Sequence, residues 1–126
     1  KARVGRTTAK GAGPEVRRID EDSLEKIITN RDIIDISQST ILYSKIENLE
    51  NINYISRLQK EGCTIAQIDE FKGMESNYVF IIGLGEVSNV EVFRDQYYKS
   101  VSRSTGICYI VEDDQVKKYL LELLNA

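Results

Sequence analysis

The sequence has 126 residues, of which 41% are hydrophobic and 29% are charged, and its formal net charge is −3. These values are typical of one folded domain, and they exclude a largely disordered chain. Histidine is absent, which excludes Ser-His-Asp and Cys-His catalytic groups and the usual zinc sites, and no apolar run approaches the roughly 20 residues of a transmembrane helix, so no membrane partner is expected.

Residues 1–14 are predicted to form an irregular, flexible basic arm. They contain three glycines and the one proline of the chain, and residues 1–18 carry six basic residues against one acidic residue. Such an arm either contacts nucleic-acid phosphates or is a frayed end whose partners are missing. Because the sequence starts without Met and without an apolar signal segment, we expect it to be a piece of a longer polypeptide.

Residues 15–126 are predicted to form one domain in which strands alternate with helices. Strands are expected at residues 15–19, 39–43, 63–68, 78–82 and 106–111. Helices are expected over residues 22–28, 49–58, 90–101 and 114–124, with Asp22 and Glu25 marking the start of the first and Asp114 capping the last. This alternation predicts an α/β three-layer sandwich with a mainly parallel sheet.

The two cysteines, Cys63 and Cys108, stand beside apolar segments that resemble strands. This placement favours buried thiols in a reducing compartment, so a cytoplasmic location is expected. A disulfide bridge between the two is the less favoured alternative.

The stretch "FKGMESNYVFIIG", residues 71–83, places polar residues directly before the most apolar run of the chain. In a parallel sheet, ligands bind beyond the carboxyl ends of the strands, and we expect Lys72, Gly73 and Glu75 in the connection that leaves the strand at residues 63–68. Gly73 would let the backbone approach a phosphate or a sugar, and Glu75 can accept hydrogen bonds from ribose hydroxyls. From spacing alone, a polar turn explains these residues as well.

A second cluster is "YYKSVSRSTGICYIV", residues 97–111. If Val101 faces the core, Arg103 is rotated by about 200° from it and points away from the buried face. An exposed arginine near strand ends can neutralise a phosphate that develops negative charge, although a solvated arginine is the simpler explanation of this residue by itself.

The phosphate-binding loops of nucleotide-binding proteins are absent from the sequence. Gly83-Leu84-Gly85 begins like a dinucleotide fingerprint, but Ser88 stands where the third glycine is needed, so we interpret it as a turn. No GxxxxGK[ST] occurs, and the chain therefore cannot cradle the phosphates of ATP by itself.

Taken together, the two clusters resemble motifs V and VI of superfamily 1 helicases of the UvrD/Rep type. "IDEFKGMESNYVFIIGL" is similar to T-I-H-x-x-K-G-L-E-x-x-x-V-x-x-x-G, and "YYKSVSRSTGICYIV" to L-Y-V-A-x-[ST]-R-A-x-x-x-L-x-[IV]. The resemblance covers residues 39–111 and implies the C-terminal part of the second RecA-like motor domain, which has a P-loop NTPase-like fold without a Walker A loop.

The resemblance also implies roles for individual residues. Arg103 would reach across an inter-domain cleft to the γ-phosphate of ATP, Glu75 would contact the nucleotide sugar, and Gly73 would shape the loop. Gln67 and Asp69 stand where the family usually has Thr and His on the nucleic-acid side, and a carboxylate facing a phosphate backbone weakens binding.

The implied partners are the N-terminal RecA-like domain of the same polypeptide and single-stranded DNA, with Lys72 on the nucleic-acid side. ATP and Mg²⁺ would be bound only with that N-terminal domain, and the fragment by itself is expected to bind neither and to hydrolyse nothing. A degenerate, non-catalytic module that binds nucleic acid or protein is the alternative. A flavodoxin-like or receiver domain fits the element order but does not explain both clusters.

Overall fold

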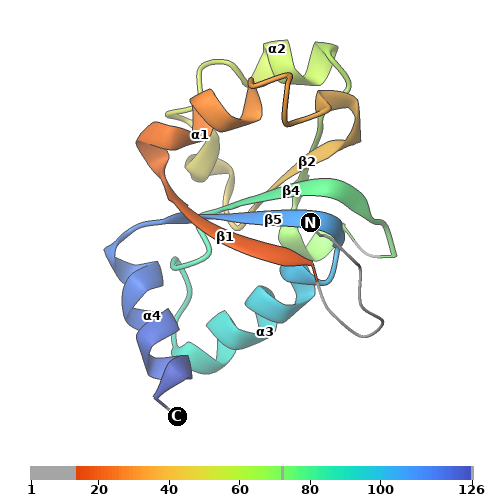
Figure 1. The fold of residues 1–126 in the computed structure, drawn as a ribbon. Helices are drawn as coiled ribbons and strands as arrows, with labels where there is room; N and C mark the ends of the chain where they lie inside the picture. Colours follow the sequence, from red (N-terminus) through yellow and green to blue (C-terminus); the bar gives the residue numbers. More distant parts are fainter. Residues whose placement is uncertain (1–13, 72, 126) are drawn as a thin grey trace.

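A wholly parallel, five-stranded sheet forms the middle layer of the computed structural model, which describes residues 14–71 and 73–125 (Figure 1). The strands are β1 Glu15–Asp20, β2 Ser39–Tyr43, β3 Thr64–Gln67, β4 Ser76–Ile82 and β5 Ser104–Glu112, in the spatial order β1-β5-β4-β2-β3. The predicted sandwich is confirmed, and all strand pairs are parallel. The proposed arm at residues 1–14 lies outside the described residues except for Pro14.

Helices cover both faces of the sheet (Figure 1). Helices α1 Glu21–Ile28 and α2 Ile55–Lys60 lie on one face, and α3 Val90–Val101 and α4 Asp114–Leu124 lie on the other. Each face of the sheet has its own hydrophobic core. In β4, Phe80 stacks on Tyr109 in the core under α1 and α2, whereas its neighbours Val79 and Ile81 belong with Phe93 to the core under α3 and α4. Because successive strand residues point to opposite faces, burial of both faces requires the continuous apolar run seen in the sequence.

Two helices are capped by aspartates that stand one or two residues before the predicted ones, and α1 begins one residue earlier than predicted. Asp20 accepts a hydrogen bond from the Ser23 amide at 2.8 Å, and Asp113 accepts one from the Val116 amide at 2.8 Å. Both aspartates stand at the carboxyl end of a strand, in extended conformation, which is the backbone geometry of an N-cap. Each helix therefore starts directly where its strand ends.

The second predicted helix, over residues 49–58, is broken in the structure. A 3₁₀ turn, η2 at Ile46–Leu49, ends at the first predicted residue, residues 50–54 form turns, and only Ile55–Lys60 is α-helical. Asn48 accepts a hydrogen bond from the Lys45 amide at 2.8 Å, a local contact that competes with helix formation. The apolar spacing still identified core residues, because Ile52 and Leu58 are buried.

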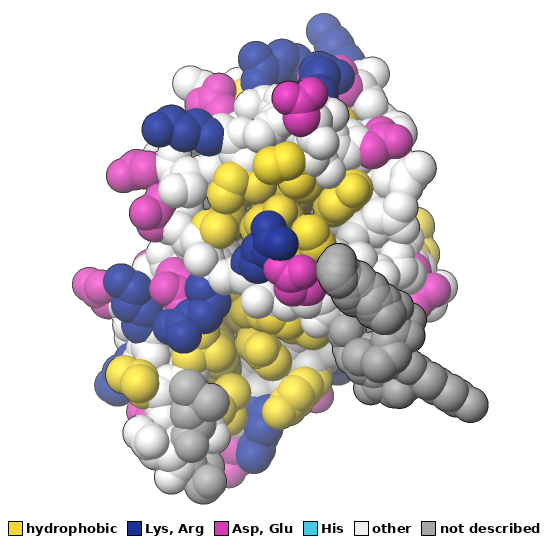
Figure 2. Space-filling model, in the orientation of Figure 1, with side chains coloured by type: hydrophobic (Ala, Val, Ile, Leu, Met, Phe, Trp, Pro, Cys, Tyr) yellow, Lys and Arg dark blue, Asp and Glu magenta, His cyan; other side chains and the backbone are white. Residues whose placement is uncertain are grey.

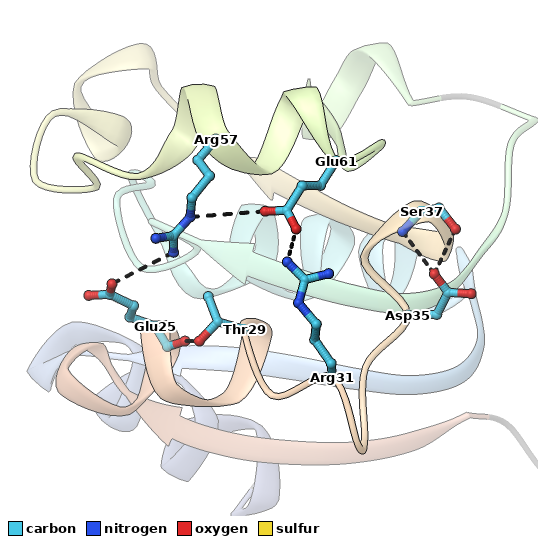
Figure 3. Close-up of polar contacts among 7 residues, drawn as sticks. All are labelled: Glu25, Thr29, Arg31, Asp35, Ser37, Arg57 and Glu61. Atoms are coloured by element: carbon cyan, nitrogen blue, oxygen red, sulfur yellow. Dashed lines mark hydrogen bonds and ion pairs between the residues drawn. The ribbon is translucent and has the colours of Figure 1, made fainter.

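Ion pairs connect α1 to α2 over the outer surface of this layer (Figure 3). Arg57 lies 3.9 Å from Glu25 and 4.0 Å from Glu61, and Glu61 also pairs with Arg31. The Arg57 and Glu25 side chains are each 56% exposed, so solvent screens the pair and its contribution to stability is small.

Charged residues mark the exposed edge strand β1. Arg17 pairs with Glu15, and Arg18 pairs with Glu112 of β5. Figure 2 shows charged side chains across the middle of this face, with hydrophobic side chains on either side of them. Charges on an edge strand oppose pairing with the strand of another molecule.

The two cysteines are buried free thiols on opposite faces of the sheet. Cys63 belongs to the core under α1 and α2, and Cys108 belongs to the core under α3 and α4, so a bridge between them is excluded. Burial raises the pKa of Cys63 to about 11 and that of Cys108 to about 12. Across residues 14–71 and 73–125, no helix is long and apolar enough to cross a bilayer.

Candidate functional site

The two sequence clusters meet at one edge of the sheet. Glu75 directly precedes β4 and Arg103 directly precedes β5, and these strands are neighbours with Ser76 and Ser104 in register. The Ser76 amide donates a hydrogen bond to the Arg103 carbonyl oxygen at 2.9 Å. Because neighbouring parallel strands lie about 5 Å apart, Glu75 and Arg103 leave the backbone side by side.

This edge is the amino edge of the sheet, so the prediction that Glu75 lies beyond the carboxyl ends of the strands is wrong. The connection at residues 68–75 starts at the carboxyl end of β3 and crosses the sheet to the amino end of β4. Parallel strands always require such a crossover. Buried Ile68 and Phe71 hold the crossover against the core under α3, and Lys72 lies outside the described residues.

Gly73 is needed for backbone conformation. Its φ is +70°, in the left-handed region that residues with a Cβ avoid, and a Cβ built there would meet no atom of the described residues within 4 Å, its chain neighbours aside. The backbone is therefore open to solvent on this side. Glu75 is exposed, and the Met74 side chain between the two is 51% exposed.

Arg103 is half-buried and is held by the end of α3. Its amide donates to the Ser100 carbonyl at 3.1 Å, and α3 is anchored in the core by Phe93, which is fully buried. Within residues 14–71 and 73–125, Arg103 forms no ion pair with a carboxylate closer than 4 Å. Its charge is therefore not neutralised within the described domain and can serve an external anion.

A polar pocket of about 410 Å³ opens beside Glu75 at the amino edge. Its walls are formed by the starts of four strands and the segment before β2, and most lining side chains carry hydroxyl or amide groups. They include Ser37, Gln38, Ser39, Thr64, Asn77 and Thr105. Among the lining residues that the structure describes, Glu75 is the one that carries a charge, so this part of the pocket suits hydroxyl groups such as those of a sugar better than a phosphate.

Gln67 lies at the carboxyl end of β3, away from the amino edge that carries Glu75 and Arg103, and Asp69 lies in the crossover that leaves β3. The Gln67 side-chain amide donates to the Ser44 carbonyl oxygen at 2.9 Å and so fastens the end of β3 to the end of β2. Asp69 is exposed beside α3, where it contributes with Asp95 to the raised pKa of Lys99; the hydrogen bond with Asp95 is the larger cause. The structure therefore does not bring Gln67 to the pair formed by Glu75 and Arg103.

The carboxyl edge carries an acidic pocket that the sequence reasoning missed. It measures about 320 Å³, and its lining includes Glu21, Glu47, Glu86, Glu112 and Asp113. Apart from Glu112 and Asp113, these residues are far apart in the sequence. The one feature of the sequence that could have predicted the cluster is that each acidic residue follows a predicted strand. Carboxylates at this density oppose the approach of a phosphate backbone.

Comparison with known proteins identifies the fold. No protein-family model matches the sequence, and no curated protein is detectably similar to it. One similar solved structure is the C-terminal domain of a possible DNA helicase from Lactobacillus plantarum WCFS1, with a TM-score of 0.53 and 13% identity over 80% of this chain and 74% of that chain. The chain has the RecA-like fold of a helicase C-terminal domain. At this identity the similarity concerns the fold alone.

Proposed function

We propose that this chain is the C-terminal motor-domain portion of an ATP-dependent DNA helicase or translocase of the UvrD/Rep-like superfamily 1. The observation that carries the proposal is the hydrogen bond between Ser76 and Arg103, since it aligns the segments that resemble motifs V and VI. The fold of a helicase C-terminal domain supports it. A cytoplasmic location is part of the proposal, supported by the free thiols.

Arg103 supplies positive charge to a nucleotide held by an N-terminal RecA-like domain. A guanidinium presents a planar fork of donors that matches phosphate oxygens, and it stays charged at all physiological pH values. In related phosphoryl transfers, an arginine supplied across a cleft accelerates the reaction by about 10³–10⁵. The absence of an internal ion pair for Arg103 among the described residues supports this role.

Glu75 accepts hydrogen bonds from the ribose hydroxyls, and the hydroxyl-rich pocket beside it accommodates the sugar. Mg²⁺ would be bound elsewhere. The described residues provide no group of three His, Cys, Asp or Glu side chains able to hold a metal ion, so we assign the metal ligands and the phosphate-binding lysine to the N-terminal domain.

Single-stranded DNA is the nucleic acid on which we propose that the protein translocates, but this domain contributes weakly to binding it. The Gln67 amide already donates to Ser44, and Asp69 presents an exposed negative charge. Both features lower the affinity of this surface for phosphates. They also favour a second candidate function, a degenerate motor-like module that binds protein or nucleic acid without hydrolysis.

The two candidates differ in the ATPase activity of the parent polypeptide. We expect the 126-residue chain to hydrolyse no ATP by itself, and the parent polypeptide to hydrolyse ATP faster when single-stranded DNA is added. A parent without a GxxxxGK[ST] loop and without ATPase activity would establish the module instead. Robust ATPase activity of the isolated chain would contradict both candidates.

A further inference from the structure

Strand β5 carries one residue more than β4 immediately after Arg103. Ser76 pairs with Ser104, and the next pair is Tyr78 with Ile107. One residue of β4, Asn77, therefore lies opposite two residues of β5, so β5 forms a bulge. A bulge of this kind bends its strand, increases the local twist and redirects the side chains beside it. The bulge begins two residues beyond Arg103, the residue to which the proposed function assigns the phosphate.

Asn77 holds the bulge by contacts from both its side chain and its backbone. Its side-chain oxygen accepts a hydrogen bond from the Thr105 hydroxyl at 2.8 Å, and its carbonyl oxygen accepts one from the Ser104 hydroxyl at 3.4 Å. A Cβ at Gly106 would lie 2.7 Å from the same carbonyl oxygen. The sequence Ser104-Thr105-Gly106 therefore supplies two hydroxyl donors and the one residue small enough for this approach.

The same asparagine extends the connection to a third strand. Its side-chain NH₂ donates to the side-chain oxygen of Gln38, the residue that directly precedes β2. The Ser76 hydroxyl donates to the Gln38 carbonyl at 2.7 Å, while the Ser76 amide donates to the Arg103 carbonyl at 2.9 Å. The polar chain of Gln38, Asn77 and Thr105 thus fastens three neighbouring strands around the backbone of Arg103.

We infer that Asn77 and Thr105 are positioning residues that aim the Arg103 side chain through the β5 bulge. The inference rests on the proposed function, because it concerns the same arginine. Loss of the hydrogen bond between Asn77 and Thr105 leaves the charge of Arg103 intact. It loosens the start of β5, which sets the direction of the Arg103 side chain. A displacement of 1 Å at a reacting centre can reduce a rate by about 100-fold.

The test uses the parent polypeptide, in which kcat and KM for ATP are measured together. Thr105→Val removes the hydroxyl and keeps the branched shape, and we expect kcat to fall about 10-fold with KM nearly unchanged. Asn77→Ala removes the acceptor instead and should give the same pattern. Thr105→Ser restores the hydroxyl, so its kcat should return close to the wild-type value.

The matched control is Asp95→Ala, which breaks the exposed ion pair to Lys99 at 3.0 Å on α3. It removes a surface contact on the helix that leads to Arg103 without touching the bulge, so kcat should not change. Thermal unfolding of each 126-residue variant shows whether the fold persists. In that chain, the Arg103 and Ser76 amide resonances should shift with Thr105→Val and stay unchanged with Asp95→Ala.

The Arg103→Ala variant separates a positioning role from a general structural one. Adding Thr105→Val to Arg103→Ala should cause no further loss of kcat, since no guanidinium remains to be aimed. An equal loss in both backgrounds, a normal kcat for Thr105→Val, or failure of Thr105→Ser to restore kcat would overturn the inference and leave the proposed function standing. Unchanged turnover of Arg103→Ala itself would overturn both.

Discussion

The Ser76 amide donates to the Arg103 carbonyl oxygen at 2.9 Å, so the loop that ends in Glu75 and the turn that ends in Arg103 are aligned by main-chain atoms. No side chain takes part in this bond. The neighbouring register pair Ser76 and Ser104 continues into the buried part of the sheet. The two candidate residues are therefore placed by the rigid core of the domain.

Replacement of Glu75 should weaken ATP binding more than it slows the chemical step. The sugar does not change during phosphoryl transfer, so a contact with its hydroxyls is equally strong in the ground state and the transition state. In the parent polypeptide, Glu75→Ala should raise KM for ATP by about 10- to 100-fold, because hydrogen bonds to charged groups contribute about 1.5–3 kcal/mol. A variant with normal KM and reduced kcat would contradict the assignment. With 2′-deoxy-ATP, the effect of the substitution should be smaller.

Replacement of Gly73 should destabilise the fold without causing a steric clash. At φ +70° an alanine is strained by about 1 kcal/mol, although the surrounding space is open. Urea unfolding of the 126-residue chain should show this loss for Gly73→Ala and a smaller one for Gly73→Asn, since asparagine tolerates the left-handed region. Equal stability of all three proteins would show that the loop adopts another conformation.

The fold was predictable because its evidence is local. The apolar run around Phe80 and the helical spacing of Val90, Phe93 and Tyr97 identify their elements without tertiary information. Crossing connections are harder. The predicted parallel sheet implies that the connection before Glu75 returns from the carboxyl edge to the amino edge, but the sequence does not show that it passes β2 on the way.

The site was predictable only in part for the same reason. Adjacency of Glu75 and Arg103 depends on β4 and β5 being neighbours in the sheet, whereas their place at the amino edge follows from the position of each directly before a strand. The bulge at residues 104–107 left no local signal, because Thr105 and Gly106 suit an ordinary turn as well. Capping residues were displaced by one or two positions where several aspartates compete for the same role.

Removal of Arg57 should cost little stability. Its two ion pairs, to Glu25 and Glu61, span 3.9 and 4.0 Å and are open to solvent (Figure 3). Arg57→Ala should lower the free energy of unfolding by at most about 1 kcal/mol, and the difference should shrink at high salt. Urea unfolding at low and high salt concentration tests this. A larger loss that is insensitive to salt would indicate that the aliphatic part of Arg57 packs against the helices.

The stability of the domain should fall as the pH rises above 9. Burial raises the pKa of Cys63 from 9.0 to about 11 and that of Cys108 from 9.0 to about 12. Above pH 9, the unfolded chain releases thiol protons that the folded chain retains, so each thiol lowers the free energy of unfolding by up to about 1.4 kcal/mol per pH unit. Below about pH 8, where the thiols are protonated in both states, neither contributes to the pH dependence.

Urea unfolding between pH 8 and 10 measures this slope. The double variant Cys63→Ala and Cys108→Ala is less stable throughout because it leaves cavities, but its stability should depend less on pH in this window. Parallel curves for the two proteins would contradict the assignment of the slope to the thiols.

Arg103 provides the most direct test of the central claim, that Glu75 and Arg103 at the amino edge of the sheet act on a nucleotide held by another domain. In the parent polypeptide, Arg103→Ala should reduce kcat for ATP by about 10³-fold or more while the Kd for ATP changes by less than about 3-fold. The kcat of Arg103→Lys, which keeps the charge but loses the planar fork of donors, should lie between that of Arg103→Ala and that of the unchanged protein. Unchanged turnover in Arg103→Ala would contradict the claim.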